Sequence, residues 1–246
     1  MFTFFKKRKP AEILPPGSIK VDMHSHLLPG IDDGSPNMEE SISLIKEFSA
    51  LGYQKLITTP HIMSDFYRNT PEIILGKLKE VQKAILEAGI DIQLEAAAEY
   101  YLDEGLMRKL ETNEELLTFG DRYLLFETSF MNPSAYLSQA VFAMQSQGYK
   151  PVLAHPERYV YLHNKYSELL SIREKGVLLQ VNINSLSGYY SKSCQKVAEQ
   201  LIEDGMVAFL GSDCHGKRHL ESLAGALKSP VTKQAYQNNL LNNLLL

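Results

Sequence analysis

Short apolar runs alternate with amphipathic segments along most of the chain. Seven runs have the length and composition of buried strands, and they are 19–23, 54–59, 92–99, 122–128, 151–154, 177–183 and 207–211. Between them apolar residues recur at helical spacing, as in the sets Leu44, Phe48 and Leu51; Ile74, Leu78, Val81 and Ile85; and Leu137, Val141 and Met144. This alternation predicts an α/β fold with parallel strands and helices outside them.

The ends of the helical segments carry matching signals. Ser35 and Pro36 precede Glu39 and Glu40, which is typical of an N-cap, a proline in the first turn and acids near the positive end of a helix. Glycine follows five helical segments, where a left-handed C-cap would precede the next strand: Gly52, Gly89, Gly148, Gly176 and Gly205. Seven strands joined in this way favour a closed or nearly closed barrel, formed by residues 19–246 as one domain.

The two ends of the chain differ from this pattern. Residues 1–18 are expected to be a flexible extension, because three phenylalanines precede four basic residues, the reverse of a secretory signal. Peripheral contact of this tip with an anionic membrane is the less favoured alternative. Residues 236–246, rich in Asn and Leu, predict a terminal helix that packs on the barrel or on a second subunit. No run of 18 apolar residues is present, so no membrane span is expected.

Composition narrows the class of protein. With 246 residues, 44% of them hydrophobic, the chain has material for one sizeable core. A net charge of -4 argues against broad nucleic-acid binding. Two cysteines cannot form a disulfide framework and fit the reducing cytoplasm. Neither Cys194 nor Cys214 has an arginine six residues later, as a cysteine phosphatase requires, so we expect both to be packing residues.

Histidines and acids gather directly after the predicted strands. Five of the seven histidines do so, and acidic residues complete the pattern at other strand ends and in the first loop. Because loops at the carboxyl ends of parallel barrel strands converge on one mouth, these residues are expected to meet in space. The candidate metal ligands are His24, His26, Asp33, His61, Glu99, Glu127, His155, Asp213 and His215.

The donor types indicate which ions fit. His24 and His26 alternate along a strand, so both rings point to the same side. Imidazole nitrogens together with carboxylate oxygens suit zinc, manganese or iron better than calcium. Nine ligands exceed the needs of one ion and predict two or three ions with shared carboxylates. His163 and His219 lie apart from the pattern and are expected to be structural.

Six segments carry a resemblance to a known family. They are 24–34 (HSHLLPGIDDG), 58–61 (TTPH), 98–100 (AEY), the strand with Glu127, 153–159 (LAHPERY) and 211–215 (GSDCH). The chain resembles the polymerase-and-histidinol-phosphatase (PHP) superfamily over about residues 21–223. More narrowly, it is similar to bacterial PHP-type tyrosine phosphatases linked to capsular and extracellular polysaccharide synthesis.

The resemblance implies a distorted seven-stranded (β/α) barrel, similar to a TIM barrel, that holds up to three divalent ions. Manganese is implied first, with iron, cobalt, magnesium or zinc as alternatives, and the nine candidates above carry over as ligands. Arg158 and Arg218 match arginines that face the phosphate in such enzymes. A phenolate leaves easily enough that a dedicated general acid is optional, and His215 or Asp33, if not saturated by metal, would fill that role. The implied substrate is phosphotyrosine on the Tyr-rich tail of a bacterial tyrosine autokinase.

Rival interpretations remain open at this stage. A small-molecule phosphatase of the histidinol-phosphate type, a PHP exonuclease and a metal-dependent amide hydrolase share much of the ligand pattern. An exonuclease disagrees with the acidic balance, and an amide hydrolase would leave Asp33, Glu99 and His215 surplus. A regulator that binds the kinase without catalysis would not need nine ligands. A further alternative for Arg158 is a structural ion pair with Glu157.

Overall fold

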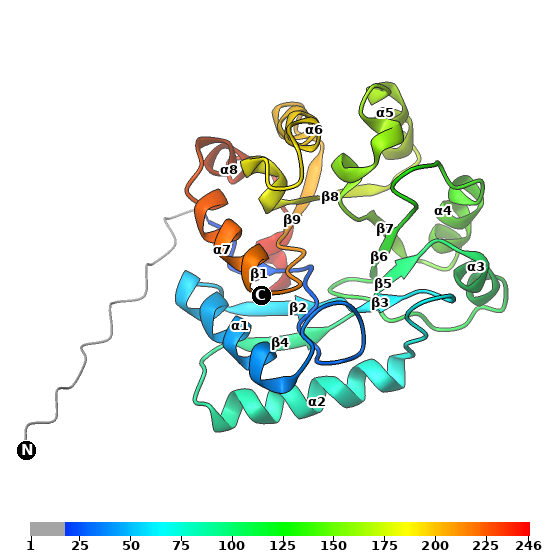
Figure 1. Ribbon diagram of the computed structural model, residues 1–246. Coiled ribbons are helices and arrows are strands. Elements are labelled where there is room, and N and C mark those ends of the chain that lie inside the picture. Colours follow the sequence, from blue (N-terminus) through cyan, green and yellow to red (C-terminus); the bar gives the residue numbers. More distant parts are fainter. Residues whose placement is uncertain (1–17) are drawn as a thin grey trace, which may run out of the picture.

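The computed structural model describes residues 18–246 (Figure 1). The prediction of a flexible extension over 1–18 therefore lies outside the described residues, apart from Ser18. The strands are β1 (Val21–Asp22), β2 (Lys55–Thr58), β3 (His61–Ile62), β4 (Gln93–Ala96), β5 (Glu99–Tyr101), β6 (Tyr123–Glu127), β7 (Lys150–Leu153), β8 (Leu178–Asn182) and β9 (Val207–Gly211).

Eight α-helices and four short 3-10 helices follow or join these strands within the described residues. The α-helices are α1 (Met38–Leu51), α2 (Pro71–Glu87), α3 (Glu104–Glu111), α4 (Leu137–Ser146), α5 (Tyr166–Glu174), α6 (Lys192–Glu203), α7 (Lys217–Ala226) and α8 (Pro230–Ala235). The 3-10 helices are η1 (Pro156–Arg158), η2 (Val160–Leu162), η3 (Ile183–Ser187) and η4 (Asn242–Leu245). The helices lie around the outside of the strands (Figure 1).

Every strand pair in the two sheets is parallel. The sheets have the strand orders β1-β2-β4 and β3-β5-β6-β7-β8-β9. The prediction of an α/β fold with parallel strands is confirmed, whereas a single closed barrel of seven strands is not. Two predicted strands are each followed by a second strand: β3 begins at His61, beyond 54–59, and β5 begins at Glu99, the last residue of 92–99, so a break separates β2 from β3 and β4 from β5. Pro60, which has no N–H to donate, lies at the first of these breaks.

Backbone contacts also join the segments after β1 and after β9. Ser25 and Cys214 form an isolated parallel bridge. The backbone N–H of Asp213 donates to the His24 carbonyl at 2.8 Å, and the N–H of His26 donates to the Cys214 carbonyl at 2.9 Å. The carboxyl ends of the first and last strands therefore lie side by side, although they are far apart in sequence.

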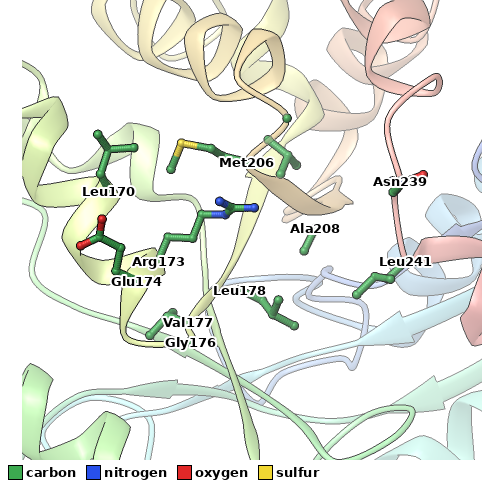
Figure 2. A pocket seen from close by; sticks show the side chains of 12 residues that line it. Leu170, Arg173, Glu174, Gly176, Val177, Leu178, Met206, Ala208, Asn239 and Leu241 are labelled. Carbon is green, nitrogen blue, oxygen red and sulfur yellow. The ribbon is translucent and has the colours of Figure 1, made fainter.

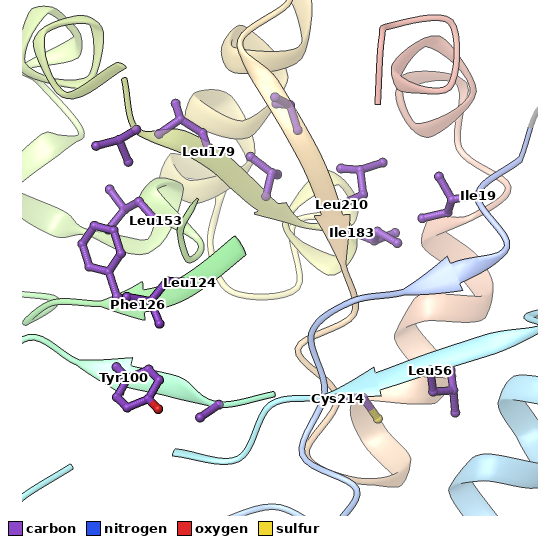
Figure 3. Packing of buried hydrophobic residues seen from close by; sticks show 14 of the residues in the cluster. Ile19, Leu56, Tyr100, Leu124, Phe126, Leu153, Leu179, Ile183, Leu210 and Cys214 are labelled. Atoms are coloured by element: carbon purple, nitrogen blue, oxygen red, sulfur yellow. The ribbon is translucent and has the colours of Figure 1, made fainter. Parts of the chain in front are cut away.

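The buried residues confirm the predicted helix faces. Leu44 and Phe48 of α1 are buried, as are Ile74, Leu78, Val81 and Ile85 of α2 and Val141 and Met144 of α4. They pack against strand residues such as Leu56, Leu153 and Leu210, which Figure 3 shows pointing into the same apolar cluster. Burial of this apolar surface is the main stabilising contribution that holds the strand ends in place.

The predicted N-cap of one helix was wrong, whereas the predicted glycines at the C-terminal ends of five helices were correct. Asn37, not Ser35, caps α1, and its side chain accepts from the N–H of Glu40. Ser35 is buried and its N–H donates instead to the His26 carbonyl at 3.0 Å. The five glycines expected at helix ends all have positive φ, the conformation in which glycine avoids a Cβ clash.

The C-terminal segment packs on strands of its own chain. The buried Asn242 side chain accepts from the N–H of Leu210 at 2.9 Å and donates to the Val21 carbonyl at 3.1 Å. Leu245 joins a second apolar cluster with Val21 and Phe209. In residues 18–246 no helix combines the length and the apolar character that crossing a membrane requires.

Candidate metal centre

The structure brings all nine predicted ligands together in one cluster at one edge of the strands. They come from the segments after β1, from β3, β5 and β6, and from the segments after β7 and β9. A cavity of about 360 Å³ opens here, lined by Asp33, His61, Glu127, Phe130, His155, Arg158, Asp213, His215 and His219. A larger cavity of about 540 Å³ lies at the amino ends of β8 and β9, and none of the nine ligands lines it (Figure 2).

The His-x-His pair forms the deepest part of the cluster. The Nε2 atoms of His24 and His26 lie 3.4 Å apart, and both rings are fully buried. Each Nε2 faces Glu99 Oε2, at 3.2 Å from His24 and 3.4 Å from His26. Asp213 Oδ1 lies 3.4 and 3.6 Å from the same two nitrogens. The prediction that both rings point to one side is confirmed.

Glu99 is the centre of the cluster. Besides the His24 and His26 contacts, its Oε2 lies 3.2 Å from His61 Nδ1 and its Oε1 lies 3.0 Å from His155 Nε2. Its side chain is fully buried. One carboxylate therefore touches four imidazoles, which is the position of a ligand shared between ions.

The outer part of the cluster faces the cavity. His61 Nδ1 also lies 3.2 Å from Glu127 Oε1, and its Nε2 lies 3.5 Å from Asp33 Oδ1. Asp33 Oδ1 is 3.6 Å from His215 Nε2, and the His215 ring stacks on that of His26 with centroids 3.9 Å apart. The Asp33 side chain is about half exposed, so this edge is open to solvent.

The chemistry of these donors fits divalent metal ions. Four overlapping groups place their ligand atoms within 4.8 Å of one another: His26, Asp33, His61 and His215; His24, His26 and Asp213; His24, Glu99 and His155; and His61, Glu99 and Glu127. The buried Nδ1 of His61 lies 3.2 Å from carboxylate oxygens of both Glu99 and Glu127 but forms no hydrogen bond of good geometry with either, although buried polar atoms usually have a hydrogen-bond partner. A bound cation would satisfy such an atom.

Electrostatics in the metal-free cluster follow from these contacts. Burial opposes the charged form of His24, but the charges of Glu99 and Asp213 outweigh it and raise its pKa to about 9. His61 is likewise buried, yet Glu99 and Glu127 raise its pKa to about 10. Burial would raise the pKa of Glu99, but His24 and His61 hold it well below its usual range. Without metal, protons on the imidazoles therefore compensate the buried carboxylates.

Two candidate ligands occupy strained backbone positions. His155 has φ of 33° and Asp213 has φ of 50°, both in the left-handed region that non-glycine residues rarely adopt. Each such residue costs on the order of 1–3 kcal/mol, and such strain clusters at functional sites. The turns after β7 and β9 thus aim both side chains into the cluster at a cost in stability.

Arg158 reaches the cavity from η1. Its Nη1 donates to Asp213 Oδ2 at 2.7 Å, and its guanidinium lies 4.7 Å from the Phe130 ring centroid and 4.4 Å from that of Tyr190. The alternative of a structural ion pair with Glu157 disagrees with this geometry. Glu157 instead accepts at Oε1 from the Asn182 N–H and the Ser185 hydroxyl.

The remaining predicted residues have different positions. Arg218 is exposed on α7 and is not among the residues that line the cavity, so its role at the phosphate stays a prediction. His219, expected to be structural, lines the cavity, with its ring 5.5 Å from that of His215. The Nε2 of His163 lies 2.9 Å from the Glu157 carbonyl, in agreement with a structural role. Both cysteines are buried, as expected of packing residues.

Several residues that support the ligands were not predicted. His26 Nδ1 lies 2.8 Å from Asp32 Oδ2, and His24 Nδ1 lies 2.8 Å from Gln180 Oε1. The Asn182 side chain donates to Asp213 Oδ2 at 2.7 Å. Such contacts fix the tautomer and the orientation of ligating rings. The sequence did carry a signal, because Gln180 and Asn182 are two polar residues on the same face of an otherwise apolar strand.

Comparison with known proteins identifies similar chains. The chain is 29% identical over 196 residues to the tyrosine-protein phosphatase YwqE of Bacillus subtilis, covering 79% of this chain and 77% of that protein. It is 28% identical over 222 residues to the tyrosine-protein phosphatase CpsB of Streptococcus pneumoniae, covering 88% of each. Crystal structures described as YwqE and CpsB, "unique metal-dependent tyrosine phosphatases", provide a match with a TM-score of 0.81 at 27% identity, covering 92% of this chain and 93% of that chain.

More distant structures share only the fold. An amidohydrolase from Mycoplasma synoviae superposes with a TM-score of 0.53 at 14% identity, covering 93% of this chain and 88% of that one. Residues 20–244 match the family described as capsular polysaccharide synthesis, CpsB/CapC, which is nearly the whole described chain. The chain therefore belongs to the CpsB/CapC family.

Proposed function

We propose that this chain is a metal-dependent protein-tyrosine phosphatase, a phosphoric monoester hydrolase. The observation that carries the proposal is the gathering of five histidines and four carboxylates beside Arg158 at one open cavity. Relatives named tyrosine-protein phosphatases support the choice of substrate. The proposed ions are two or three in number, with manganese first. The proposed barrel comprises the two parallel sheets, closed by the contacts between the ends of β1 and β9.

The residues of the chain divide the chemistry between them. Divalent ions held by the nine ligands would supply a hydroxide at neutral pH and neutralise charge on the phosphoryl oxygens. Arg158 binds the phosphate, because its planar guanidinium matches two oxygens and its side chain is about one-quarter exposed at the cavity. The guanidinium of Arg158 lies over the faces of the Phe130 and Tyr190 rings, and these contacts fix its orientation.

Departure of the leaving group makes smaller demands on the protein. A phenolate has a conjugate acid with a pKa of about 10, so it leaves more easily than an alkoxide. Asp33 and His215 lie together at the rim, with Oδ1 and Nε2 3.6 Å apart, and whichever of the two is not saturated by metal is the proposed proton donor for the leaving oxygen. Asp33 is the more exposed of the two.

The proposed physiological substrate is a phosphorylated Tyr-rich tail of a bacterial tyrosine kinase that controls polysaccharide synthesis. The family description names capsular polysaccharide synthesis, which supports this partner. An open cavity with a half-exposed Asp33 at its edge suits a tyrosine on a peptide better than an enclosed metabolite. We place the reaction in the cytoplasm, with no nucleic acid involved and with the membrane reached at most through the kinase.

The proposal predicts turnover of aryl phosphates by the full chain with manganese. p-Nitrophenyl phosphate and a phosphotyrosine peptide should both be hydrolysed, and prior removal of metal with a chelator should abolish the activity. Histidinol phosphate, assayed in parallel, should be the poorer substrate by kcat/KM. Equal turnover with and without metal would contradict the proposal, and a preference for histidinol phosphate would favour the small-molecule alternative.

Substitution of the two arginines separates their roles. Arg158→Ala should lower kcat/KM for p-nitrophenyl phosphate about 100-fold, the usual cost of removing one group that stabilises transition-state charge. Arg218→Ala tests the second predicted arginine: Arg218 is exposed and outside the cavity lining, so a change in kcat/KM of less than about threefold would remove it from the phosphate site. Retained kcat/KM in Arg158→Ala at normal metal content would remove Arg158 from the site. A loss of more than tenfold in Arg218→Ala would assign that arginine to the phosphate after all.

A further inference from the structure

One residue of the cavity differs in kind from all the others. Of the nine described residues that line it, eight are charged or carry an imidazole, and Phe130 is the one apolar side chain. Phe130 is 36% exposed, so part of its ring is available to a molecule in the cavity. It lies in the loop between β6 and α4, outside every motif that identified the ligands.

The Phe130 ring is held in place by rigid neighbours. Its centroid lies 5.6 Å from that of His155, in a stacked arrangement, and 5.8 Å from the fully buried ring of Tyr159. The guanidinium of Arg158 lies 4.7 Å from the same centroid. The ring therefore stands between a candidate metal ligand and the candidate phosphate-binding group.

This position has a consequence for the organic part of a phosphate ester. When the phosphoryl group lies between the ligands and Arg158, the group bonded to its ester oxygen must leave the cavity past these lining residues. No carboxylate, imidazole or guanidinium offers such a group a wholly apolar contact, although imidazole and guanidinium planes can stack on an aromatic ring. Phe130 alone among the described lining residues offers one, and an aromatic pair contributes beyond ordinary apolar burial.

We propose that Phe130 determines the specificity of this site, by stacking on the aryl group of the substrate so that aryl phosphates are preferred over alkyl phosphates. The inference rests on the proposed function and deepens it by naming the residue that selects the substrate class. Two roles of Phe130 can be distinguished. Orienting Arg158 would change kcat/KM for every phosphate ester equally, whereas stacking would change kcat/KM for aryl esters alone.

The test compares two esters of similar size, phenyl phosphate and cyclohexyl phosphate, with the manganese-loaded full chain. Phe130→Leu and Phe130→Ala should lower the ratio of kcat/KM for phenyl over cyclohexyl phosphate by roughly three- to tenfold, the range of one aromatic pair contact. Phe130→Tyr, which keeps the ring, should retain the ratio. Intrinsic reactivity cancels, because each ratio is compared with that of the unsubstituted chain.

The matched control is Phe142→Leu, since Phe142 is 72% exposed on α4 and does not line the cavity. Its ratio should equal that of the unsubstituted chain. An equal loss for both esters in the Phe130 variants, at normal metal content, would overturn the inference and leave the proposed function intact. Absence of any metal-dependent turnover by the unsubstituted chain would overturn both.

Discussion

Glu99→Gln should lower kcat/KM for p-nitrophenyl phosphate by about 10³-fold or more and should reduce the bound metal. Removal of a group that merely supports a ligand typically costs 10- to 100-fold in metal affinity or activity, and a shared ligand should cost more. Glu99 occupies that position, because its two oxygens lie within 3.4 Å of nitrogens of His24, His26, His61 and His155. The amide keeps the shape of the side chain but removes the charge that cations require.

The matched control for this variant is Glu95→Gln. Glu95 belongs to β4, its side chain is 42% exposed, and it pairs with Lys55 away from the cluster. Metal content measured by elemental analysis, turnover and thermal unfolding should all remain close to those of the unsubstituted chain. If Glu99→Gln retained its metal and its activity while staying folded, the shared-ligand role would be disproved.

The clustering of the nine candidate ligands could be predicted because it depends on topology more than on detailed packing. Parallel strands bring their carboxyl ends to one edge, so a histidine or acid after each apolar run must join the same cluster wherever the helices lie. His24 and Asp213 illustrate this, since 188 intervening residues separate them and a backbone hydrogen bond joins their segments. The resemblance to known motifs added the arginines and the substrate class.

The breaks between β2 and β3 and between β4 and β5 could not be predicted from the apolar pattern, although other strand bounds, such as 207–211 for β9, were predicted correctly. The predicted run 54–59 covers β2, but Pro60 follows it and a further strand, β3, starts at His61. The neighbouring segment breaks at the corresponding position, because β2 pairs with β4 in one sheet and β3 pairs with β5 in the other. Hydrophobicity does not report such a break, which depends on which neighbour each strand pairs with.

The phase of a helix is a second feature that the sequence leaves undetermined. Arg218 and His219 are consecutive in the first turn of α7, and consecutive helical side chains point in directions about 100° apart. The start of α7 at Lys217 places His219 on the cavity and leaves Arg218 exposed. Phe130 was missed for a related reason, since loop conformation alone brings its ring to the cavity.

The affinity for manganese should rise roughly 10³-fold or more between pH 6.5 and pH 8.5. A ligating imidazole must be neutral, so metal binding has to displace the protons that His24 and His61 hold in the metal-free protein. Burial disfavours those protons, but Glu99 with Asp213, and Glu99 with Glu127, raise the two pKa values to about 9 and about 10. Two protons released per binding event give up to about a hundredfold change in affinity per pH unit below these values.

Thermal stability should show the opposite trend when the metal is absent. An unfolded histidine has a pKa of about 6.5, so the raised folded values stabilise the metal-free protein fully below that pH. This stabilisation is lost as the pH rises through about 9 and about 10. The Tm contribution of this cluster should therefore fall with rising pH in metal-free protein, whereas saturation with manganese should add more to Tm at the higher pH.

Competition with a chelator of known affinity at several pH values would measure the first trend, and calorimetry in buffers of different ionisation enthalpy would count the released protons. Thermal unfolding at several pH values, with and without manganese, would measure the predicted pH dependence of Tm. His163→Gln should keep both slopes, because His163 contacts the Glu157 carbonyl rather than the cluster. A manganese affinity that did not change with pH would mean that these imidazoles are already neutral in the metal-free protein. The charge compensation around Glu99 would then have to come from other groups.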